Sequence, residues 1–456
     1  MQTAISAVPP RVAPPEKPLG RLGFIARYVR NPLSVVPREA YEQDFVQVGG
    51  RMAWVSAPSM VKTVLLDERD KFHKLAQIRL LGPLLGKGIL TSEGAEWKWQ
   101  RQASAPVFRY QDLMTFVPTF VRTTETLIAK WRAMPAGTVQ PIERDMTGVT
   151  FDVISATLLP SGDRTVASAV ERATGRFQRS GAWAQLYAVA NVPKWVPQPG
   201  RLAMASAVYI LRSSVAALLR ERHAAGEPSG DAHDDLLHRL IGAKDPETGK
   251  SMNDEQLIDN LLTFYLAGHE TTAKALTWTL FLLSRSSQWA GALEEEIERV
   301  TGGAPVAAEH IERLALVQQV LKESMRIYPP VPMMSRQAVA DTSLDGHPVK
   351  AGMSVVMPIY AIHRHRKRWE DPDAFDPQRF APEREAKIPR YQYMPFGAGP
   401  RICIGTAFAM IEATAMLATL LRHARFSPVD GYEPEPIARV TLLPRGGMPL
   451  KVSLRS

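Results

Sequence analysis

Hydrophobic positions recur at helical spacing through most of the chain between residues 96 and 300, with breaks where proline and glycine cluster near 192–200 and 225–230. A spacing of three to four residues is typical of helices that bury one face. β-Prone stretches are short and lie at residues 44–48 and 53–55. The pattern predicts a mainly α chain with small β-sheets, and it does not show the strand–helix alternation of a dinucleotide-binding fold.

Three later segments have equally simple patterns. Residues 340–358 alternate in polarity around an Asp-Gly pair, which predicts a β-hairpin. Residues 405–423 are apolar and predict a buried helix. Residues 437–453 predict a terminal hairpin that turns at the glycine pair 446–447.

The longest predicted helix begins near Asn253 and continues without proline to about Arg285. Asp254 and Glu255 suit its N-terminus, where negative charge is favoured. Its length raises the question of a membrane span, but ionisable and amide side chains inside it would be costly in hydrocarbon. These are Asp259, Asn260, His269, Glu270 and Lys274. We expect a long helix through the core of a large domain.

The N-terminal residues 1–35 begin with many prolines and lack the basic start and apolar centre of a signal peptide. We expect a proline-rich leader there, no membrane anchor, and one large domain over residues 36–456, in a cytoplasmic protein. The chain has one cysteine, which excludes an intramolecular disulfide, a cysteine-ligated zinc site and an iron–sulfur cluster.

The formal net charge is +9 and the isoelectric point about 9.6. Such a balance suits nucleic acid, an anionic membrane surface or an acidic protein partner. The densest basic run, residues 364–368, lies inside a segment that contains Trp and Pro, so we interpret it as a solvated face and do not expect nucleic-acid binding.

Chemistry concentrates around the single cysteine, Cys403. The preceding loop contains glycines and a proline, and such a loop can hold its backbone close to a flat ligand. Cys403 lies just before the helix 405–423, where the helix dipole and free N–H groups favour a thiolate. A buried structural cysteine is the commonest alternative. A nucleophilic cysteine is another, although no histidine lies in the loop to activate it.

The segment from Phe396 to Gly405 reads F-x-x-G-x-R-x-C-x-G. It resembles the haem-binding signature of the cytochrome P450 family. The resemblance implies the cytochrome P450 fold, haem b (iron protoporphyrin IX) as cofactor, and Cys403 as the thiolate ligand of its iron. It also assigns four residues of the loop to haem binding, namely Phe396, Gly399, Arg401 and Gly405.

Two further segments resemble family motifs in the correct order. Glu323 and Arg326 match E-x-x-R on a helix, and Arg379 follows in a segment similar to P-E-R-F. The resemblance implies that the three form a structural network behind the haem. Gln378 replaces the usual Glu at a position outside that network.

Residues 267–272 read A-G-H-E-T-T in the middle of the long helix and match the family's A-G-x-[D/E]-T motif. Gly and Thr are mediocre helix residues, which predicts a local widening of the helix. Glu270 as an acid and Thr271 as a hydroxyl fit stepwise proton delivery to bound oxygen, and we take these two as catalytic.

Other expected haem contacts are Trp97 and Arg101, which share one helix face and can hold a propionate, and Arg336. Leu90 matches a family residue that overhangs the haem. We expect the substrate pocket to be apolar and to include Leu90, Phe264, Ala267, Val331 and Val440. His363 and His365 have the spacing of a metal pair, but we favour a solvated or propionate-side role for them.

The function that the resemblance implies is monooxygenation by a soluble, bacterial-type member of the family. An apolar substrate (aliphatic, terpenoid or aromatic) would be hydroxylated with O₂ and two electrons. We expect a monomer that receives the electrons from a separate ferredoxin and ferredoxin reductase, because no reductase domain follows the cysteine loop. An acidic ferredoxin would suit the basic chain and could dock near residues 364–368.

Two other functions stay open at this level. A relative that rearranges or consumes peroxides would need no reductase, although Glu270 and Thr271 argue against it. A haem-binding sensor or carrier would need a second strong axial ligand, for which His269 is the only histidine in the motif.

Overall fold

The helix expected near Asn253 is the central element of the computed structural model, which describes residues 8–135, 137–158, 184, 187–188, 192–193, 195–197, 201–225 and 235–455. It is α11 (Asp254–Ser284), and it begins with a capping box in which Asn253 and Gln256 satisfy each other's backbone N–H groups. Most of its length is buried, which explains its nearly continuous apolar sequence.

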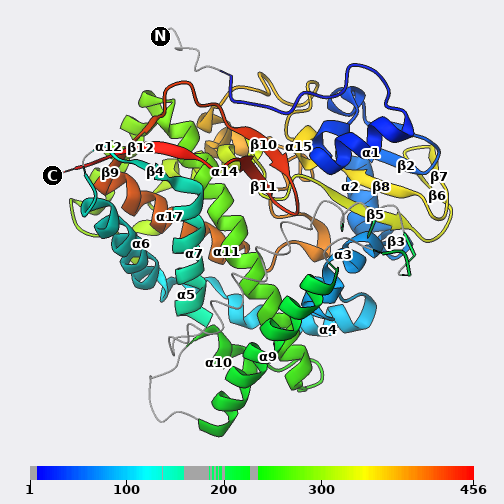
Figure 1. Cartoon of the computed structure of the whole chain (residues 1–456), viewed down its shortest axis with the longest axis horizontal. Helices are drawn as coiled ribbons and strands as arrows, with labels where there is room; N and C mark the ends of the chain where they lie inside the picture. Colours follow the sequence, from blue (N-terminus) through cyan, green and yellow to red (C-terminus); the bar gives the residue numbers. More distant parts are fainter. Residues whose placement is uncertain are drawn as a thin grey trace.

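The longer helices pack around α11 (Figure 1). They are α6 (Val117–Arg132), α7 (Ile142–Leu158), α9 (Arg201–Ala225), α12 (Ser287–Thr301), α14 (Ala315–Ile327) and α17 (Thr406–His423). Each of them buries a face of large apolar side chains, which together form one continuous core. The predicted apolar helix at 405–423 is therefore confirmed, as is the mainly α architecture of a single domain.

Shorter helices connect these elements. They are α1 (Arg21–Arg30), α2 (Pro58–Lys62), α3 (Leu75–Leu85), α4 (Gly94–Ser104), α5 (Tyr110–Met114), α10 (Leu236–Ile241), α13 (Ala308–Ile311), α15 (Ile359–Ile362) and α16 (Pro382–Glu385). The glycine and proline cluster near 225–230 and most of the one near 192–200 lie outside the described residues.

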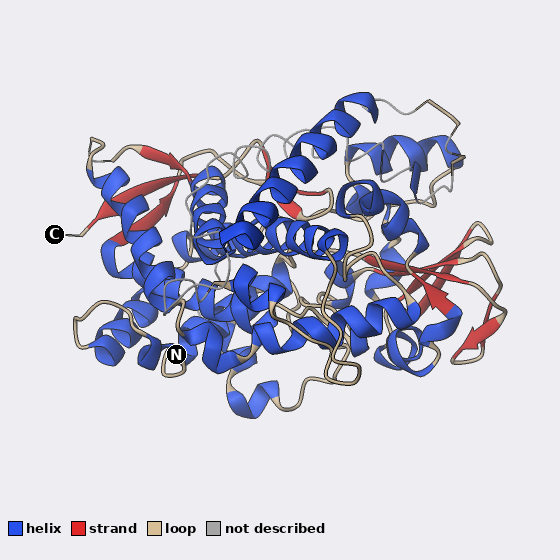
Figure 2. Cartoon of the chain, turned by 90° about the horizontal axis from the view of Figure 1, so that it is seen from below, coloured by secondary structure: helices blue, strands red, loops and turns tan. Residues whose placement is uncertain are grey.

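A five-stranded sheet lies at one end of the molecule (Figure 2). Its strand order is β1 (Phe45–Val48), β2 (Met52–Val55), β8 (Ser354–Met357), β5 (Met334–Ala338) and β3 (Phe72–His73). The strands predicted at 44–48 and 53–55 are its β1 and β2, which pair antiparallel. The predicted Asp345-Gly346 hairpin is also confirmed, as β6 (Thr342–Leu344) and β7 (His347–Val349).

The C-terminal prediction was only partly right. A hairpin does form, between β10 (Glu435–Ala438) and β11 (Leu442–Arg445), but it turns before residue 442 and not at Gly446-Gly447. The last strand, β12 (Pro449–Leu454), pairs instead with β4 (Val139–Pro141) and β9 (Ala424–Pro428) in a separate sheet. Pairing with β4 joins residues more than 300 positions apart, which a local pattern cannot reveal.

The described part of the N-terminal segment follows the body of the domain before α1 begins (Figure 1). Tyr328 donates its hydroxyl proton to the carbonyl of Pro10 at 2.8 Å, and the N–H of Val12 lies 3.2 Å from the hydroxyl of Tyr360. Arg11 forms an ion pair with Asp373. The segment is thus anchored at several points along its length.

In the described part of the chain, no helix combines the length and the apolar character that crossing a membrane requires.

Candidate functional site

The cysteine loop (Phe396–Gly405) ends at the start of α17. It is preceded by a long, largely irregular segment of residues 363–395 that follows α15, called the meander below. Cys403 donates its backbone N–H to the carbonyl of Phe396 at 2.9 Å, which closes the loop around the sulfur. At the other side, the hydroxyl of Thr406 bonds to the carbonyl of Cys403 at 2.9 Å. These two bonds fix the backbone on both sides of the only cysteine.

Gly399 occupies a place in this loop that only glycine can fill. Its φ of +71° is in the left-handed region, and a Cβ there would lie 2.6 Å from the carbonyl oxygen of Leu65. The loop is therefore pressed against the segment Thr63–Asp67, and its shape is set by that contact.

Cys403 is exposed, although protein atoms still crowd around its thiol. Burial raises its pKa above the ordinary value, while the N–H of Gly405, the charge of Arg101 and the hydroxyl of Thr406 act in the opposite direction. The sequence predicted thiolate stabilisation from the helix start, and the Gly405 amide does contribute it, but desolvation outweighs it. A bound cation beside the sulfur would reverse this balance.

Basic side chains gather beside the loop. Arg401 donates to the carbonyl of Ser92 at 2.9 Å and forms an ion pair with Glu93. Lys74 is buried and donates to the carbonyl of Leu90 at 2.6 Å. Burial, together with the nearby charges of Arg401 and Arg336, lowers the pKa of Lys74 to about 7.

Arg336, on β5, is buried beside these groups and has few partners of its own. Its guanidinium donates to the carbonyl of Ser335 at 2.8 Å and forms no ion pair among the described residues. Burial and the charge of Arg401 lower its pKa to about 10, against a smaller opposite effect of Glu93. This arginine is therefore placed where added negative charge would be favourable.

Helix α4 supplies the two residues that the sequence paired. Arg101 donates to the carbonyl of Ile402 at 2.9 Å, which ties α4 to the cysteine loop. The guanidinium carbon of Arg401 lies 4.2 Å from the centre of the Trp97 ring, in a cation–π contact. The structure thus brings Trp97, Arg101 and Arg401 together around Cys403.

These residues fit a haem. A thiol that faces open space would supply the metal ligand, and the surrounding cations would match two propionates. Of the four basic side chains Lys74, Arg101, Arg336 and Arg401, that of Arg401 pairs with the carboxylate of Glu93. The same carboxylate accepts the backbone N–H of Lys74 at 3.1 Å. Negative charge added at this point would offset the burial of Arg336 and Lys74.

The motif of the long helix faces the interior of the domain at its middle. Ala267 is exposed although it lies in the centre of a buried helix, so this turn borders open space. Thr271 bonds to the carbonyl of Ala267 at 2.7 Å, and Glu270 accepts a hydrogen bond from Thr441 at 2.7 Å. The two predicted catalytic residues thus have local partners on α11 and on the turn between β10 and β11.

The predicted widening of α11 at this motif is wrong. The helix is α-helical from Asp254 to Ser284. Thr271 returns its hydroxyl to the carbonyl of Ala267, four residues earlier in the same helix.

The side chain of His269, in the same motif, contacts α7. Its ring lies edge-on to Phe151 of α7, and its Nδ1 is 2.9 Å from the carbonyl of Tyr265. Burial lowers its pKa, which favours the neutral ring. Its contacts are those of a packing residue between α11 and α7, which argues against the sensor with a second histidine ligand.

The predicted pocket residues come from four segments. Leu90 lies in a loop held against α11 through Ile89, whose N–H donates to Asn260 at 2.8 Å. Phe264 and Ala267 are one turn apart on α11, and Phe264 is buried edge-on to Phe108 at 5.2 Å.

Val331 and Val440 belong to the other two pocket segments. A hydrogen bond of 2.9 Å from the N–H of Leu442 to the carbonyl of Pro330 brings these segments together. Both valines are half-buried.

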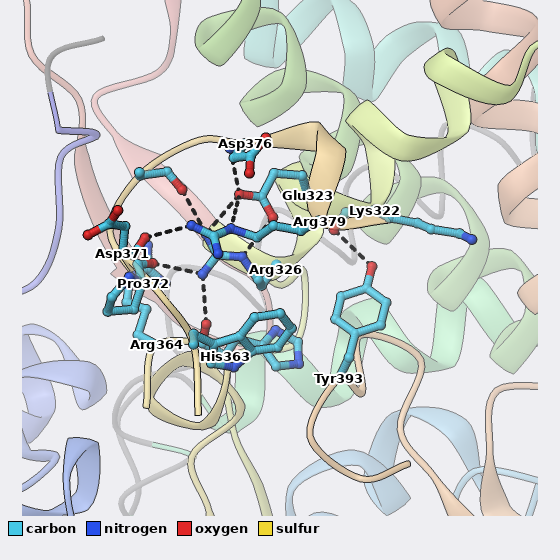
Figure 3. A network of polar contacts seen from close by, with 12 residues as sticks. Lys322, Glu323, Arg326, His363, Arg364, Asp371, Pro372, Asp376, Arg379 and Tyr393 are labelled. Carbon is cyan, nitrogen blue, oxygen red and sulfur yellow. Dashed lines mark hydrogen bonds and ion pairs between the residues drawn. The ribbon is translucent and has the colours of Figure 1, made fainter. Parts of the chain in front are cut away.

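Glu323, Arg326 and Arg379 form the predicted network (Figure 3). Arg326 makes two hydrogen bonds to Glu323, at 2.7 and 2.8 Å, and Arg379 lies 3.4 Å from the same carboxylate. Arg326 also donates to the carbonyls of His363, Pro372 and Ala374. The network therefore fastens α14 to the meander that leads to the cysteine loop.

The two histidines of the meander are not solvated, as the sequence suggested, but buried. His363 accepts the N–H of Met394 at 2.8 Å, and burial with the charges of Arg326 and Arg364 lowers its pKa to about 3. Burial likewise lowers the pKa of His365 to about 4. No cluster of three or more metal-binding side chains occurs among the residues that the structure describes.

The basic run 364–368 is also not a free charged face. Arg364 is buried beside Asp373, and Arg366 and Arg368 form ion pairs with acidic residues near β1. The partners Glu42 and Asp44 lie more than 300 residues away in sequence, which is why the run looked unpaired. The charge of the run is thus partly neutralised, while Arg366 and Lys367 stay exposed.

Sequence reasoning missed three residues near the site. Lys74 and Glu93 gave no signal, because each is a single charge in a mixed segment. Glu412 did give one, as the only carboxylate in the apolar stretch of α17. Burial raises its pKa to about 8, and a hydrogen bond with Thr272 links it to α11 beside Thr271.

Comparison with known proteins agrees with this site. The family model of cytochrome P450 matches residues 45–452. The chain is 30% identical over 431 residues to cyclooctat-9-en-7-ol 5-monooxygenase of Streptomyces melanosporofaciens, covering 92% of each chain. It is 31% identical over 415 residues to putative cytochrome P450 132 of Mycobacterium bovis, covering 88% of this chain and 87% of that one.

A plant relative is similar at the same level. The chain is 30% identical over 419 residues to 11-oxo-beta-amyrin 30-oxidase of Glycyrrhiza uralensis, covering 87% of this chain and 79% of the relative. The matches extend over the cysteine loop, the long helix and the Glu323 network alike. The chain therefore belongs to the cytochrome P450 family of monooxygenases.

Proposed function

We propose that this enzyme hydroxylates an apolar, multi-ring small molecule of the terpenoid class, with O₂ and with electrons from a separate ferredoxin. The observation that carries the proposal is the position of Cys403. Its thiol faces open space beside a surplus of buried cations, and its helix α17 packs against the α11 helix that carries Glu270 and Thr271.

The residues of the loop and its neighbours would hold haem b. Cys403 would be the iron ligand, and Phe396, Gly399 and Gly405 would shape the loop beneath the ring. The basic side chains of Arg101, Arg336 and Arg401, with the indole N–H of Trp97, would bind the propionates. Bound in this way, the haem supplies the activation of dioxygen that no side chain can provide.

Glu270 and Thr271 would deliver protons on the substrate side. The hydroxyl of Thr271 bonds to Ala267 and can rotate to donate instead into the space that Ala267 borders. Glu270 is linked to Thr441 on the opposite side of that turn. An acid next to an alcohol provides an exchangeable pair of protons within one helical turn.

The substrate class is inferred from the pocket and from the relatives. The side chains expected at its wall (Leu90, Phe264, Ala267, Val331 and Val440) are apolar and offer little for a charged ligand. Cyclooctat-9-en-7-ol 5-monooxygenase and 11-oxo-beta-amyrin 30-oxidase are named for oxidation of large, largely hydrocarbon molecules. We therefore place a terpenoid alcohol or hydrocarbon ahead of a fatty acid or a simple aromatic.

The electron donor would approach the side of the molecule where the cysteine loop reaches the surface. Ile402, next to Cys403, is 39% exposed, and Arg101 of α4 is bonded to its carbonyl. The same helix carries Lys98, which is exposed apart from a surface ion pair with Glu247. An acidic ferredoxin would be attracted to this face and to the basic chain as a whole.

Substitution Cys403→Ser tests the assignment of the iron ligand. We expect the variant to lose the red-shifted absorption that reduced, CO-bound haem shows with a thiolate ligand, because no second cysteine can replace it. His269→Asn is the matched control and should keep the band. A Cys403→Ser protein that retains it would show that another group binds the iron.

Reduction by ferredoxin tests the donor. The rate of iron reduction should fall as ionic strength rises, since the Debye length shrinks from about 10 Å at 0.1 M salt to about 3 Å at 1 M. Lys98→Glu should slow it at low salt, whereas Lys350→Glu, an exposed residue directly after β7, should not. If the rate of iron reduction changes neither with salt nor with Lys98→Glu, the ferredoxin does not dock on α4.

A further inference from the structure

A cavity lies away from the cysteine loop, between the N-terminal segment and the segment that follows α15. Its volume is about 250 Å³, far more than one water molecule occupies. One wall is formed by the N-terminal residues 11–16. The opposite wall consists of Arg38, Tyr41, Tyr360, Arg364, Arg366 and Asp373.

Arg364 brings hydrogen-bond donors to this cavity for which the described part of the protein has no acceptor. Its side chain is 4% exposed, yet Nε and Nη1 are buried without a hydrogen-bond partner in the described chain. The nearest carboxylate oxygen, Oδ1 of Asp373, is 3.7 Å from Nε, too far for a hydrogen bond. Buried donors without acceptors are uncommon in native proteins and indicate a water, an ion or a ligand.

The position of Arg364 is nevertheless fixed. Its guanidinium carbon lies 3.9 Å from the centre of the Tyr360 ring and 5.8 Å from that of Tyr328. Stacking on an aromatic ring holds the planar group while leaving its edge free to donate. Tyr41 also lines the cavity, and its buried hydroxyl has no hydrogen-bond partner among the described residues.

Charge around the cavity is positive. Four arginines line it, at positions 11, 38, 364 and 366, against the carboxylates of Glu16 and Asp373 and that of Glu42, which pairs with Arg366. Asp373 is already shared by Arg11 and Arg364. The unused donors and the excess of positive charge both favour an anion with several acceptor oxygens.

We propose that this cavity binds a small oxyanion, a phosphate or a carboxylate group, through Arg364 and the hydroxyl of Tyr41. The N-terminal residues 11–16 form the outer wall and act as a lid, with Arg11 positioned to contact the same anion. Since Tyr328 and Tyr360 bond to residues 10 and 12, the lid is anchored beside the site even before a ligand binds. The site is independent of the proposed substrate and electron donor.

The test is a calorimetric titration of the full-length, haem-loaded protein with sodium phosphate and, separately, with sodium acetate, at ionic strength held constant with sodium chloride. We expect saturable binding of one anion per chain. Arg364→Gln should weaken it at least tenfold, and Arg364→Lys, which keeps the charge but loses the planar fork, should weaken it less. Binding of phosphate alone would identify a phosphate-bearing ligand, and binding of acetate alone a carboxylate.

Arg11→Ala keeps the test meaningful if changes at the buried Arg364 impair folding, because Arg11 lies at the surface. This variant should bind the anion severalfold more weakly. Lys350→Gln, an exposed cation directly after β7, is the control and should bind as the parent does. In parallel, the anion should slow backbone hydrogen exchange in residues 11–16 of the parent.

Two results would overturn the proposal. One is the absence of saturable binding of either anion at millimolar concentration. The other is binding that is equally strong in the parent, Arg364→Gln and Arg11→Ala proteins, which would place the anion elsewhere.

Discussion

Two buried arginines, Arg326 of α14 and Arg336 of β5, show how differently this protein treats positive charge. Arg326 has five N–H donors, and all five are used, two on Glu323 and three on backbone carbonyls. Arg336 is nearly as deeply buried, yet it donates to a single carbonyl, that of its neighbour Ser335. The fold provides an acceptor for every N–H donor of Arg326, whereas among the described residues it provides only one for Arg336.

The difference separates structural charge from ligand-binding charge. A buried charge is tolerated when partners replace its lost hydration. The fold provides these partners for Arg326 through the meander (Figure 3). For Arg336, burial and then the positive charge of Arg401 lower the pKa to about 10, and the carboxylate of Glu93 offsets this only in part. A negatively charged ligand is the missing partner, and the haem propionates would supply it.

Breaking the complete network should have the largest effect. Glu323→Gln leaves Arg326 and Arg379 without their carboxylate, and losing one member of a buried ion pair costs about 3–5 kcal/mol. We expect urea unfolding to shift by this amount, or the protein to fail to accumulate. Glu385→Gln, which removes a partly exposed pair with Lys322, is the control and should cost about 1 kcal/mol or less. Equal effects of the two substitutions would contradict the comparison.

Arg336→Met should act in opposite directions on the protein without and with haem. Removing a buried, poorly partnered charge should leave the apoprotein as stable as the parent or more stable by about 1–2 kcal/mol. Haem affinity, measured by titration of the apoprotein, should fall about tenfold or more, because a charge-assisted bond to a propionate is lost. If Arg336→Met destabilises the apoprotein as strongly as Glu323→Gln does, Arg336 stabilises the fold itself and is not reserved for a ligand.

The meander should also make stability depend on pH. The pKa of His363 is about 3 in the folded state, below the ordinary value of 6.5, so the folded protein binds fewer protons between these limits. Its stabilising contribution is complete above pH 6.5 and is lost as the pH falls toward 3. For one proton the slope is about 1.4 kcal/mol per pH unit.

Urea unfolding between pH 7 and 4.5 measures this slope. His363→Asn should flatten it, although the variant will be less stable at pH 7 because Met394 loses its acceptor. His347→Asn, on the exposed β6–β7 hairpin, should leave the slope as in the parent. An unchanged slope in His363→Asn would assign the acid sensitivity to other groups.

The sequence predicted what depends on local periodicity or on a fixed motif. Helices α11 and α17 follow from their apolar spacing, and the β6–β7 hairpin follows from Asp345-Gly346. Glu323 and Arg326 could be placed together because they are three residues apart on one helix.

What the sequence could not show depends on distant partners. The ion pairs of Arg366 and Arg368 in the basic run require acidic residues near β1 that only the fold brings close. The pairing of β12 with β4 likewise has no local signature. The surplus of charge around Arg336 could not be foreseen, because Lys74 enters it from a segment without a recognisable motif.

The anchoring of the N-terminal segment has a consequence for the order of events during synthesis. Val12 is bonded to Tyr360, 348 residues later, and Pro10 to Tyr328, 318 residues later. At about 5–20 residues per second, a ribosome needs about 20–70 s to make Tyr360 after Val12. This segment must therefore wait for more than 300 further residues before its partners exist. It is among the last to dock, and until then the cavity beside Arg364 has no outer wall.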